Sequence, residues 1–363
     1  MPFRKKIIMA IVLMFVSLII VGQASAILIF PDPTLTALQY GDAYSYSLPI
    51  LNYLATGEVT QNPGDPYYVA SSPGQIEDLI VIATGASGSP VNTNFPGMNN
   101  AYPTPSGVSG SPIFSTFNTP HPGIPGVPPG APFPGDSPNT WNTTLSALIN
   151  QLTISGTRYD LVFFFNNNQD NAGSAAEQSL YAWAQASIVD AQGVLPTLYF
   201  DFTSVGPVPH DGIPGGDVFA YNSPGPPTSN YPFSSGPYDS GTWPSFDDFV
   251  LSGGQVCLDE NTLAIVDCGT CTNCVLFNHN LGANQAAYAL FAPELNAGLE
   301  TWMNEGYDVM SLDLRITALN NGYEQLFIMP GLIQRQIPEP SSIVLLGSGL
   351  LGLGLYFRRK FRK

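Results

Sequence analysis

The amino-acid sequence predicts a mainly β protein whose body is an antiparallel, sandwich-like domain with a few short helices and long Pro/Gly-rich loops. The chain contains 36 Gly and 34 Pro, which favour many turns. Only 10 % of its residues are charged, although the wet faces of helices normally carry Lys and Glu. Hydrophobic residues make up 44 %, enough for a core, and many fall in short runs or at alternate positions, as in strands.

Residues 1–26 predict a secretory signal peptide. Arg4, Lys5 and Lys6 precede an apolar run over residues 7–21, and Ala24 and Ala26 form a small-x-small cleavage site. An uncleaved N-terminal anchor is the alternative. Under either interpretation, the rest of the chain is expected to be exported.

The expected mature body, residues 27–337, is strongly acidic. It holds 26 of the 27 acids and three arginines, Arg158, Arg315 and Arg335, and it has no lysine, so its formal net charge is −23. Nucleic acids and anionic lipid surfaces are bound through basic patches, which this composition does not supply. Divalent cations and neutral or cation-bridged polysaccharides are the compatible partners.

The first half of the body predicts two strands and a long loop. In residues 44–50 the larger side chains alternate, and Pro49 suggests an edge strand. Residues 79–83 form a short, β-branched apolar run that predicts a buried strand. Residues 85–140 are dense in Pro and Gly, so we expect a surface excursion that contributes nothing to the core.

The middle of the body predicts a helix followed by three strands. Asn142 or Thr143 can cap a helix with apolar residues at 145, 148, 149 and 152 on one face. The five apolar residues 161–165 predict a central strand buried on both sides. Residues 180–189 fit a strand better than a helix, because residues 190–193 then turn the chain into the alternating segment 197–202.

The last part of the body predicts another loop, a helix and a hairpin. Residues 206–244 form a second Pro/Gly-rich excursion, after which residues 249–251 and 263–266 resume strand character. A helix begins at Ala292-Pro293 and ends at Gly306. Residues 310–317 alternate, Asn320-Asn321-Gly322 predicts a turn, and residues 326–329 are expected to return as the hairpin partner.

Two short segments resemble each other. Phe165-Asn166-Asn167-Asn168 precedes Gln178 and Tyr181, and Phe277-Asn278-His279-Asn280 precedes Gln285 and Tyr288. The gaps differ by several residues. The similarity indicates either two related sheet edges or chance, and it is not a repeat array.

The four cysteines are Cys257, Cys268, Cys271 and Cys274. In a cytosolic protein this spacing would suggest zinc or an iron–sulfur cluster, but in an exported chain two disulfides are the expectation. Three connectivities exist. Pairing of Cys257 with Cys271 and of Cys268 with Cys274 is favoured. The Cys268–Cys274 bridge encloses a five-residue loop, which is less strained than the two-residue loop that a bridge between nearer cysteines would enclose.

Catalytic signatures are scarce. The sequence has no Gly-x-Ser-x-Gly and no His-Glu-x-x-His motif. We expect its three histidines, His121, His210 and His279, to be solvated or hydrogen-bonded rather than catalytic. The adjacent acids Glu77-Asp78, Asp247-Asp248 and Asp259-Glu260 are expected by chance in so acidic a body, and a glycosidase needs a carboxylate separation that sequence does not establish.

No cofactor is predicted, although calcium is compatible with the acids. Hard cations bind carboxylate and carbonyl oxygens in Asp/Asn/Gly loops, and Asp259-Glu260-Asn261 and Asn166-Asn167-Asn168-Gln169-Asp170 resemble such loops only loosely. We expect them to be turns. The aromatic residues, including Trp141, Trp183, Trp243 and Trp302, could stack on sugars, but core packing explains most of them equally well.

The C-terminal segment, residues 338–363, has three parts. Pro338-Glu339-Pro340 comes first, an apolar run over residues 343–357 follows, and the chain ends in the basic sequence Arg358-Arg359-Lys360-Phe361-Arg362-Lys363. This resembles a PEP-CTERM sorting signal, and the resemblance covers only these residues. It implies recognition of Pro338, Glu339 and Pro340 by an exosortase, a membrane transpeptidase-like enzyme of Gram-negative bacteria. The apolar run is short for a membrane helix and predicts a transient anchor with its basic end in the cytoplasm.

These observations predict an exported inner-membrane intermediate that is processed and delivered to the cell surface or extracellular matrix. The expected function is that of a non-enzymatic component associated with exopolysaccharide in a biofilm. Two alternatives remain: a secreted polysaccharide hydrolase and a specific carbohydrate-binding protein. No interaction with nucleic acid is expected.

Overall fold

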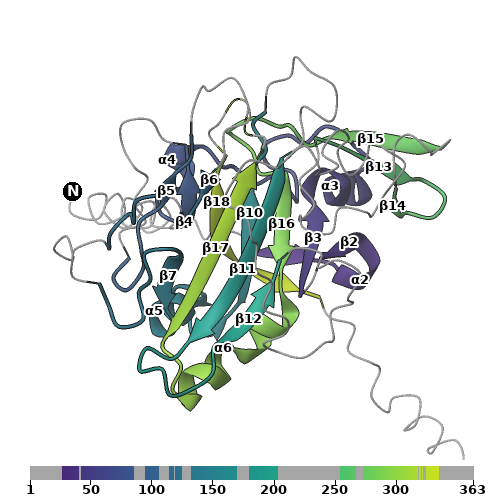
Figure 1. Cartoon of the computed structure of the whole chain (residues 1–363). Helices are drawn as coiled ribbons and strands as arrows, with labels where there is room; N and C mark the ends of the chain where they lie inside the picture. The colour runs from purple at the N-terminus through teal and green to yellow at the C-terminus, as the bar shows by residue number, and fades with distance from the viewer. Residues whose placement is uncertain are drawn as a thin grey trace, which may run out of the picture.

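Two β-sheets packed face to face form the centre of the protein (Figure 1). The computed structural model describes residues 27–40, 42–85, 95–105, 114–117, 119–124, 132–169, 180–202, 254–266, 273–317, 319, 321 and 324–334. Within these residues one sheet has eight strands and the other has five. Most pairs are antiparallel, and β1–β18 and β4–β5 are parallel. The predicted mainly β, sandwich-like class is therefore confirmed.

The eight-stranded sheet has the order β2-β3-β16-β10-β18-β4-β5, with β1 beside the far end of β18. Its strands are β1 (Leu28–Phe30), β2 (Ala37–Tyr40), β3 (Ala43–Ser47), β4 (Ile80–Thr84), β5 (Tyr102–Pro103), β10 (Asp160–Phe165), β16 (Tyr288–Phe291) and β18 (Leu326–Ile333). The short helices α2 (Pro33–Thr36) and α4 (Pro73–Ile76) precede β2 and β4.

The five-stranded sheet has the order β12-β11-β17-β6, with β7 also paired to β17. Its strands are β6 (Phe114–Ser115), β7 (Trp141–Thr144), β11 (Tyr181–Val189), β12 (Leu198–Asp201) and β17 (Val309–Thr317). The nine paired positions of β11 and β17 make this the longest ladder of the protein's described part. The predicted strand over residues 180–189 and its hairpin with β12 are confirmed.

The central strand β10 is confirmed as predicted. It lies between β16 and β18, and its five apolar residues, 161–165, are all buried. Both faces of β10 are buried because the eight-stranded sheet has a hydrophobic core on each side. Phe163 and Phe165 face the five-stranded sheet, whereas Val162 and Phe164 face the opposite side.

The expected hairpin between residues 310–317 and 326–329 is wrong, although both segments are strands. β17 belongs to the five-stranded sheet and β18 to the eight-stranded one, so the chain crosses between the sheets here. β18 pairs with β10 on one side and with β4 and β1 along the other. It is a central strand rather than the last hairpin partner.

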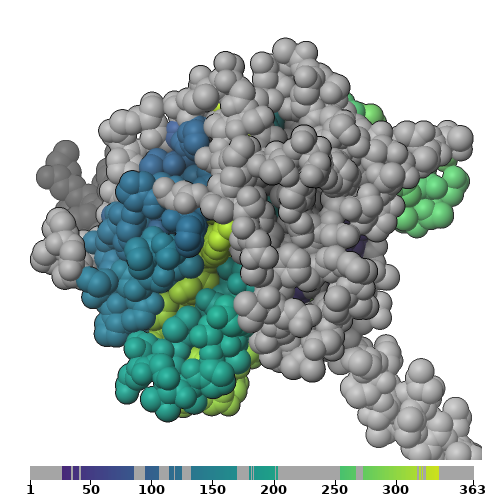
Figure 2. Space-filling view, in the orientation of Figure 1, coloured from purple at the N-terminus to yellow at the C-terminus, as the bar shows by residue number. Residues whose placement is uncertain are grey.

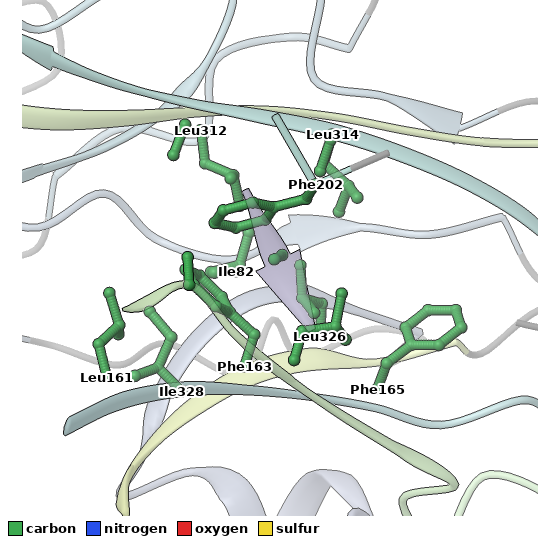
Figure 3. Packing of buried hydrophobic residues seen from close by; sticks show 14 of the residues in the cluster. Ile82, Leu161, Phe163, Phe165, Phe202, Leu312, Leu314, Leu326 and Ile328 are labelled. Carbon is green, nitrogen blue, oxygen red and sulfur yellow. The ribbon is translucent and has the colours of Figure 1, made fainter. Parts of the chain in front are cut away.

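The main core fills the space between the sheets. Figure 3 shows Phe163, Phe165 and Leu326 from the eight-stranded sheet facing Phe202 and Leu314. The rings of Phe163 and Phe202 meet edge to face with centroids 5.2 Å apart. An entirely apolar cavity of about 30 Å³ remains here, which suffices for roughly one water and not for a ligand.

A second core covers the other face of the eight-stranded sheet. Phe30, Tyr46, Phe164, Phe291 and Phe327 form its centre, and all are buried. Phe164 and Phe327 stack with ring centroids 5.6 Å apart. With apolar side chains on both faces, this sheet is the protein's middle layer.

The predicted edge strand over residues 44–50 is only partly correct. β3 ends at Ser47, and α3 (Leu48–Thr56) begins with Pro49 in its first turn. The Ser47 hydroxyl accepts a hydrogen bond from the Ile50 N–H, which caps the helix. Pro49 therefore starts a helix, and β3 is not an edge strand because it pairs with both β2 and β16.

The two longer predicted helices are confirmed with one changed cap. α5 (Leu145–Gln151) begins after Thr144, whose hydroxyl accepts the Ala147 N–H, whereas Asn142 and Thr143 lie in β7. α6 (Pro293–Glu305) ends at Gly306, whose φ of +106° is a left-handed conformation that suits glycine.

The segment over residues 85–140 contributes to the core, contrary to expectation. Met98, Ala101, Tyr102 and Phe114 are each at most 2 % exposed. Tyr102 lies in β5 beside β4, and Phe114 lies in β6 beside β17. Local Pro and Gly content predicted a surface loop because it does not report the tertiary contacts that bury single aromatic residues. The excursion over residues 206–244 lies outside the described residues, as does the predicted strand at 249–251.

Candidate functional site

The outer face of the five-stranded sheet carries a group of ordered polar side chains beside one half-exposed aromatic ring, which could meet a ligand. Along β17, Ser311, Asp313 and Arg315 alternate with leucines and an isoleucine that face the core. Part of β17, yellow-green in Figure 2, reaches the surface beside the blue segments that precede α5. We call the set Thr116, Phe117, Asp313 and Arg315 the Arg315 cluster.

Arg315 is fixed by a forked ion pair. Its Nη2 lies 2.7 Å from Oδ2 of Asp313, and its Nε lies 3.2 Å from Oδ1. Both side chains are partly shielded, with 10 % and 19 % of their surfaces exposed. The two parallel hydrogen bonds hold the guanidinium plane in one orientation.

The half-exposed aromatic ring of Phe117 lies beside the Arg315 guanidinium. The Arg315 guanidinium carbon lies 5.4 Å from the centroid of the Phe117 ring, a cation–π distance. Phe117 is 46 % exposed. Thr116 donates a hydrogen bond to Asp313 Oδ1 and accepts the Leu314 N–H, which ties the segment after β6 to β17.

A second polar group lies farther along the same face and is largely buried. Asp136 Oδ1 accepts hydrogen bonds from the side-chain amides of Asn99 (3.3 Å) and Asn142 (2.8 Å) and lies 3.2 Å from Nε2 of His121. Ser311 donates to Asn142 Oδ1 at 2.7 Å. His121 is thus hydrogen-bonded, as expected, although sequence did not predict its partners because they are 15 or more positions away.

Of the two interpretations left open for the tryptophans, core packing holds for Trp141 and Trp302. Trp141 is fully buried and donates its indole N–H to the Asn99 carbonyl. Trp302 is 8 % exposed and packs against Phe200 with ring centroids 5.2 Å apart. Trp183 occupies the register position opposite Arg315 on β11. Trp243 lies outside the described residues.

His279 is buried beside Ser47. Its Nε2 lies 2.6 Å from the Ser47 hydroxyl, its Nδ1 lies 3.2 Å from the Phe277 carbonyl, and its ring stacks on Tyr288. Because burial disfavours the imidazolium, the pKa of His279 falls to about 3. The neutral ring donates from Nδ1 and accepts the Ser47 proton at Nε2. This pair resembles a nucleophile and base, but Ser47 caps α3 and is 1 % exposed, so the arrangement is structural.

Glu324 is a buried acid that sequence reasoning missed. It is 0 % exposed, and neither carboxylate oxygen has a hydrogen-bond partner of good geometry in the described structure. Burial raises the pKa of its carboxyl group to about 8, against a partial lowering by the nearby backbone N–H groups of Glu324 itself and of Asn168. The carboxyl group is therefore mostly protonated at neutral pH. No local pattern marked this residue, since it lies between the predicted turn at 320–322 and the predicted strand that begins at 326.

The two similar segments meet in space. Asn280 accepts the Gln169 N–H through its side-chain oxygen and donates its amide to the Gln169 carbonyl, both at 2.8 Å. In the same way, the side-chain oxygen Oδ1 of Asn166 accepts a hydrogen bond from the Gln325 backbone N–H. These amides join the ends of β10 and β18 to the segment after β15, so they fix loops and are not open to a ligand.

The cysteines lie at a three-stranded sheet, β14-β13-β15. Cys257 is in β13 (Gln255–Asp259), Cys274 begins β15 (Cys274–Asn278), and β14 is Ile265–Val266. Neither Cys257 nor Cys274 is a free thiol. Cys268 and Cys271 lie outside the described residues, so the predicted pairing stays a prediction.

The loosely calcium-like loops do not form a metal centre in the described part of the chain. Asp259 uses its carboxylate to accept the N–H groups of Asn261 and Thr262 in the β13–β14 turn. Among the described residues no group of three or more His, Cys, Asp or Glu side chains converges. Glu77 and Asp78 are exposed on the turn before β4. Asp170, His210, Asp247 and Asp248 lie outside the described residues.

Two predicted export features lie outside the described residues: the cleavage site at Ala24 and Ala26, and the motif Pro338-Glu339-Pro340. In the described segments of residues 27–334, no helix combines the length and hydrophobicity that a membrane crossing requires. The signal peptide therefore stays a prediction.

Comparisons with known proteins identify two regions of the chain. Residues 28–315 match the family described as "Domain of unknown function (DUF8239)", and residues 336–360 match the PEP-CTERM protein-sorting motif. The predicted C-terminal sorting signal is thus confirmed. No curated protein and no solved structure gives a match.

Proposed function

We propose that this chain, which belongs to the DUF8239 family and is sorted by an exosortase through its PEP-CTERM motif, is a non-enzymatic exopolysaccharide-associated protein of the cell surface or matrix. The motif implies export, exosortase processing and delivery to the surface of a Gram-negative bacterium. Polysaccharide is the abundant polymer in that location. A protein body with a formal charge of −23 is compatible with binding a neutral polysaccharide, because no charge on the polymer repels it.

The Arg315 cluster carries the proposal. Sugar rings are bound by flat apolar faces together with fixed hydrogen-bond donors, and the half-exposed Phe117 ring lies against a guanidinium that Asp313 holds in place. Because the ion pair is formed within the protein, binding requires little ordering of these side chains.

Retention on polysaccharide tests this function. Purified neutral exopolysaccharide from the host is immobilised, and binding of the processed protein is measured for wild type, Phe117→Ala and Val194→Ala. Val194, 78 % exposed in the turn between β11 and β12, serves as the matched apolar control. We expect Phe117→Ala to weaken binding roughly tenfold, as for an aromatic contact near the centre of an interface, and Val194→Ala to leave it unchanged.

Three outcomes would contradict the proposal in different ways. Equal binding by Phe117→Ala and wild type would assign polysaccharide contact to another surface, and no binding by wild type would remove polysaccharide as the partner. Release of reducing ends from the polymer by wild-type protein would show a hydrolase instead.

A further inference from the structure

The sheet edge formed by β1 and the end of β18 exposes an apolar surface. Ile29 and Leu332 are register partners on these parallel strands, and they are 49 % and 45 % exposed. They occupy the same face because Phe30 and Ile333, their neighbours, point into the second core. Single exposed hydrophobic side chains occur elsewhere on this surface, but Ile29 and Leu332 lie side by side and so form a small continuous apolar patch.

An open groove adjoins this pair. It has a volume of about 390 Å³, and its lining consists of Ile27, Leu28, Ile29, Pro31, Pro66, Tyr67 and Gln334. The Tyr67 hydroxyl donates to the Ile29 carbonyl at 3.1 Å, which fixes the wall of the groove. Its side chains are mostly apolar, with the hydroxyl of Tyr67 and the amide of Gln334 as polar groups and without a Lys or Arg. We call this groove together with Leu332 the β1–β18 edge.

The β1–β18 edge lies where the sorting signal leaves the folded body. The Gln334 N–H donates to the Phe30 carbonyl at 2.8 Å, so Gln334 is bound to β1 at this edge. Only residues 335–342 separate Gln334 from the apolar run that begins at Ile343. Even fully extended, eight residues reach about 30 Å. While the anchor remains attached, the β1–β18 edge is held close to the bilayer surface.

The N-terminal end of the body also lies at the β1–β18 edge. Ile27 is the first residue after the predicted signal peptide, and Leu28 pairs with Gly331 of β18. Before signal cleavage, only the five residues 22–26 would therefore separate a second hydrophobic segment, residues 7–21, from this edge. Two tethers at one sheet edge orient the body more strongly than one tether does.

We propose that the β1–β18 edge contacts the outer surface of the inner membrane in the anchored intermediate, with Ile29 and Leu332 at the boundary between headgroups and acyl chains. Aliphatic side chains and a tyrosine suit this boundary. Because the acidic body supplies no basic patch, the contact depends on burial of these apolar side chains and on the tether, and not on attraction to anionic lipids. The tether supplies a high effective concentration, so that a contact too weak to bind a free protein to lipid suffices here. This inference depends on the sorting motif and not on polysaccharide binding.

Site-specific photo-cross-linking tests the contact in the full-length chain. A benzophenone amino acid replaces Ile29, Leu332 or, as the control, Val194, and the chain is expressed with its signals in a host without exosortase. Membranes are irradiated, and adducts are identified by intact mass. We expect phospholipid adducts at positions 29 and 332 in at least about fivefold higher yield than at position 194, which lies in the loop between β11 and β12 of the five-stranded sheet.

Every other result counts against the proposal. Equal lipid adducts at the three positions would show no preferred orientation, and adducts with a protein of the membrane or with a second copy would assign the β1–β18 edge to that partner. Absence of the chain from the membrane fraction would remove the intermediate itself. Polysaccharide retention of the processed protein would be unaffected by any of these outcomes.

Discussion

The Ser47 hydroxyl lies 2.6 Å from Nε2 of His279, although the two residues are 232 positions apart in the chain. This contact joins the start of α3 to the segment after β15, and it requires a neutral imidazole. Glu324 presents the opposite case, a buried carboxyl group that must be protonated. The described part of the protein therefore buries an imidazole and a carboxyl group whose neutral forms favour the folded state.

These two groups predict a bell-shaped dependence of stability on pH. The pKa of His279 falls from 6.5 to about 3 on folding, so stability declines as pH drops from 6.5 toward 3. The pKa of Glu324 rises from 4.5 to about 8, so stability declines as pH increases from 4.5 toward 8. Between pH 4.5 and 6.5 the two slopes oppose each other. We expect a plateau there and losses on both sides.

Urea unfolding of residues 27–337 between pH 3 and 9 measures this profile. Each limb has a limiting slope of about 1.4 kcal/mol per pH unit from its single group. Glu324→Gln should flatten the alkaline limb, and His279→Gln should flatten the acid limb. An alkaline limb that persists unchanged in Glu324→Gln would show that another group controls it.

The core between the sheets predicts a strong effect of Phe163→Ala. Phe163 is 1 % exposed and packs against Phe202. Its truncation should lower the free energy of unfolding by about 3–5 kcal/mol. Ile154→Ala, at a 38 % exposed position in the short hairpin of β8 (Thr153–Ile154) and β9 (Thr157–Arg158), should cost less than about 0.5 kcal/mol. Equal losses in denaturant titrations would contradict the packing.

The central position of β18 predicts that the body needs its last strand. A chain that ends at residue 325 lacks the partner of β10, β4 and β1, whereas one that ends at residue 337 keeps all three pairings. We expect the shorter chain to be unfolded or aggregated and the longer one to unfold cooperatively. Circular dichroism and thermal melting distinguish them, and a folded shorter chain would refute the sheet order.

The cysteines predict complete oxidation in the exported protein. Alkylation without reductant, followed by mass analysis, should label none of Cys257, Cys268, Cys271 and Cys274, because the compartment is oxidising. Peptide mapping then assigns the pairs, with Cys257–Cys271 and Cys268–Cys274 expected. Labelling of three or four thiols would indicate a metal site instead.

The sorting motif predicts a processing defect on substitution. Glu339→Ala with Pro340→Ala, in a host that carries an exosortase, should leave a full-length membrane form because the enzyme no longer recognises its motif. Fractionation and intact mass follow the chain. Normal processing and surface delivery of this variant would mean that residues 338–363 act as an ordinary anchor.

Sequence alone determined the elements whose apolar pattern is set by local burial. The five apolar residues of β10, the alternation in β11 and β17, and the start and stop residues of α6 each specify one element through its period or its caps. The sorting motif was equally readable, because it is recognised as a linear segment.

Tertiary structure decided which strands pair and which polar residues are buried. An alternating segment reports that one face is covered but not by which sheet, so β17 and β18 were predicted as one hairpin and lie in two sheets. The same holds for Tyr102 and Phe114 within a Pro/Gly-rich segment, and for Ser47, Asp136 and Glu324, whose environments come from distant parts of the chain. The propensity of a segment to form a helix or a strand can be read from its own residues. Burial depends on contacts between residues that are far apart in the sequence.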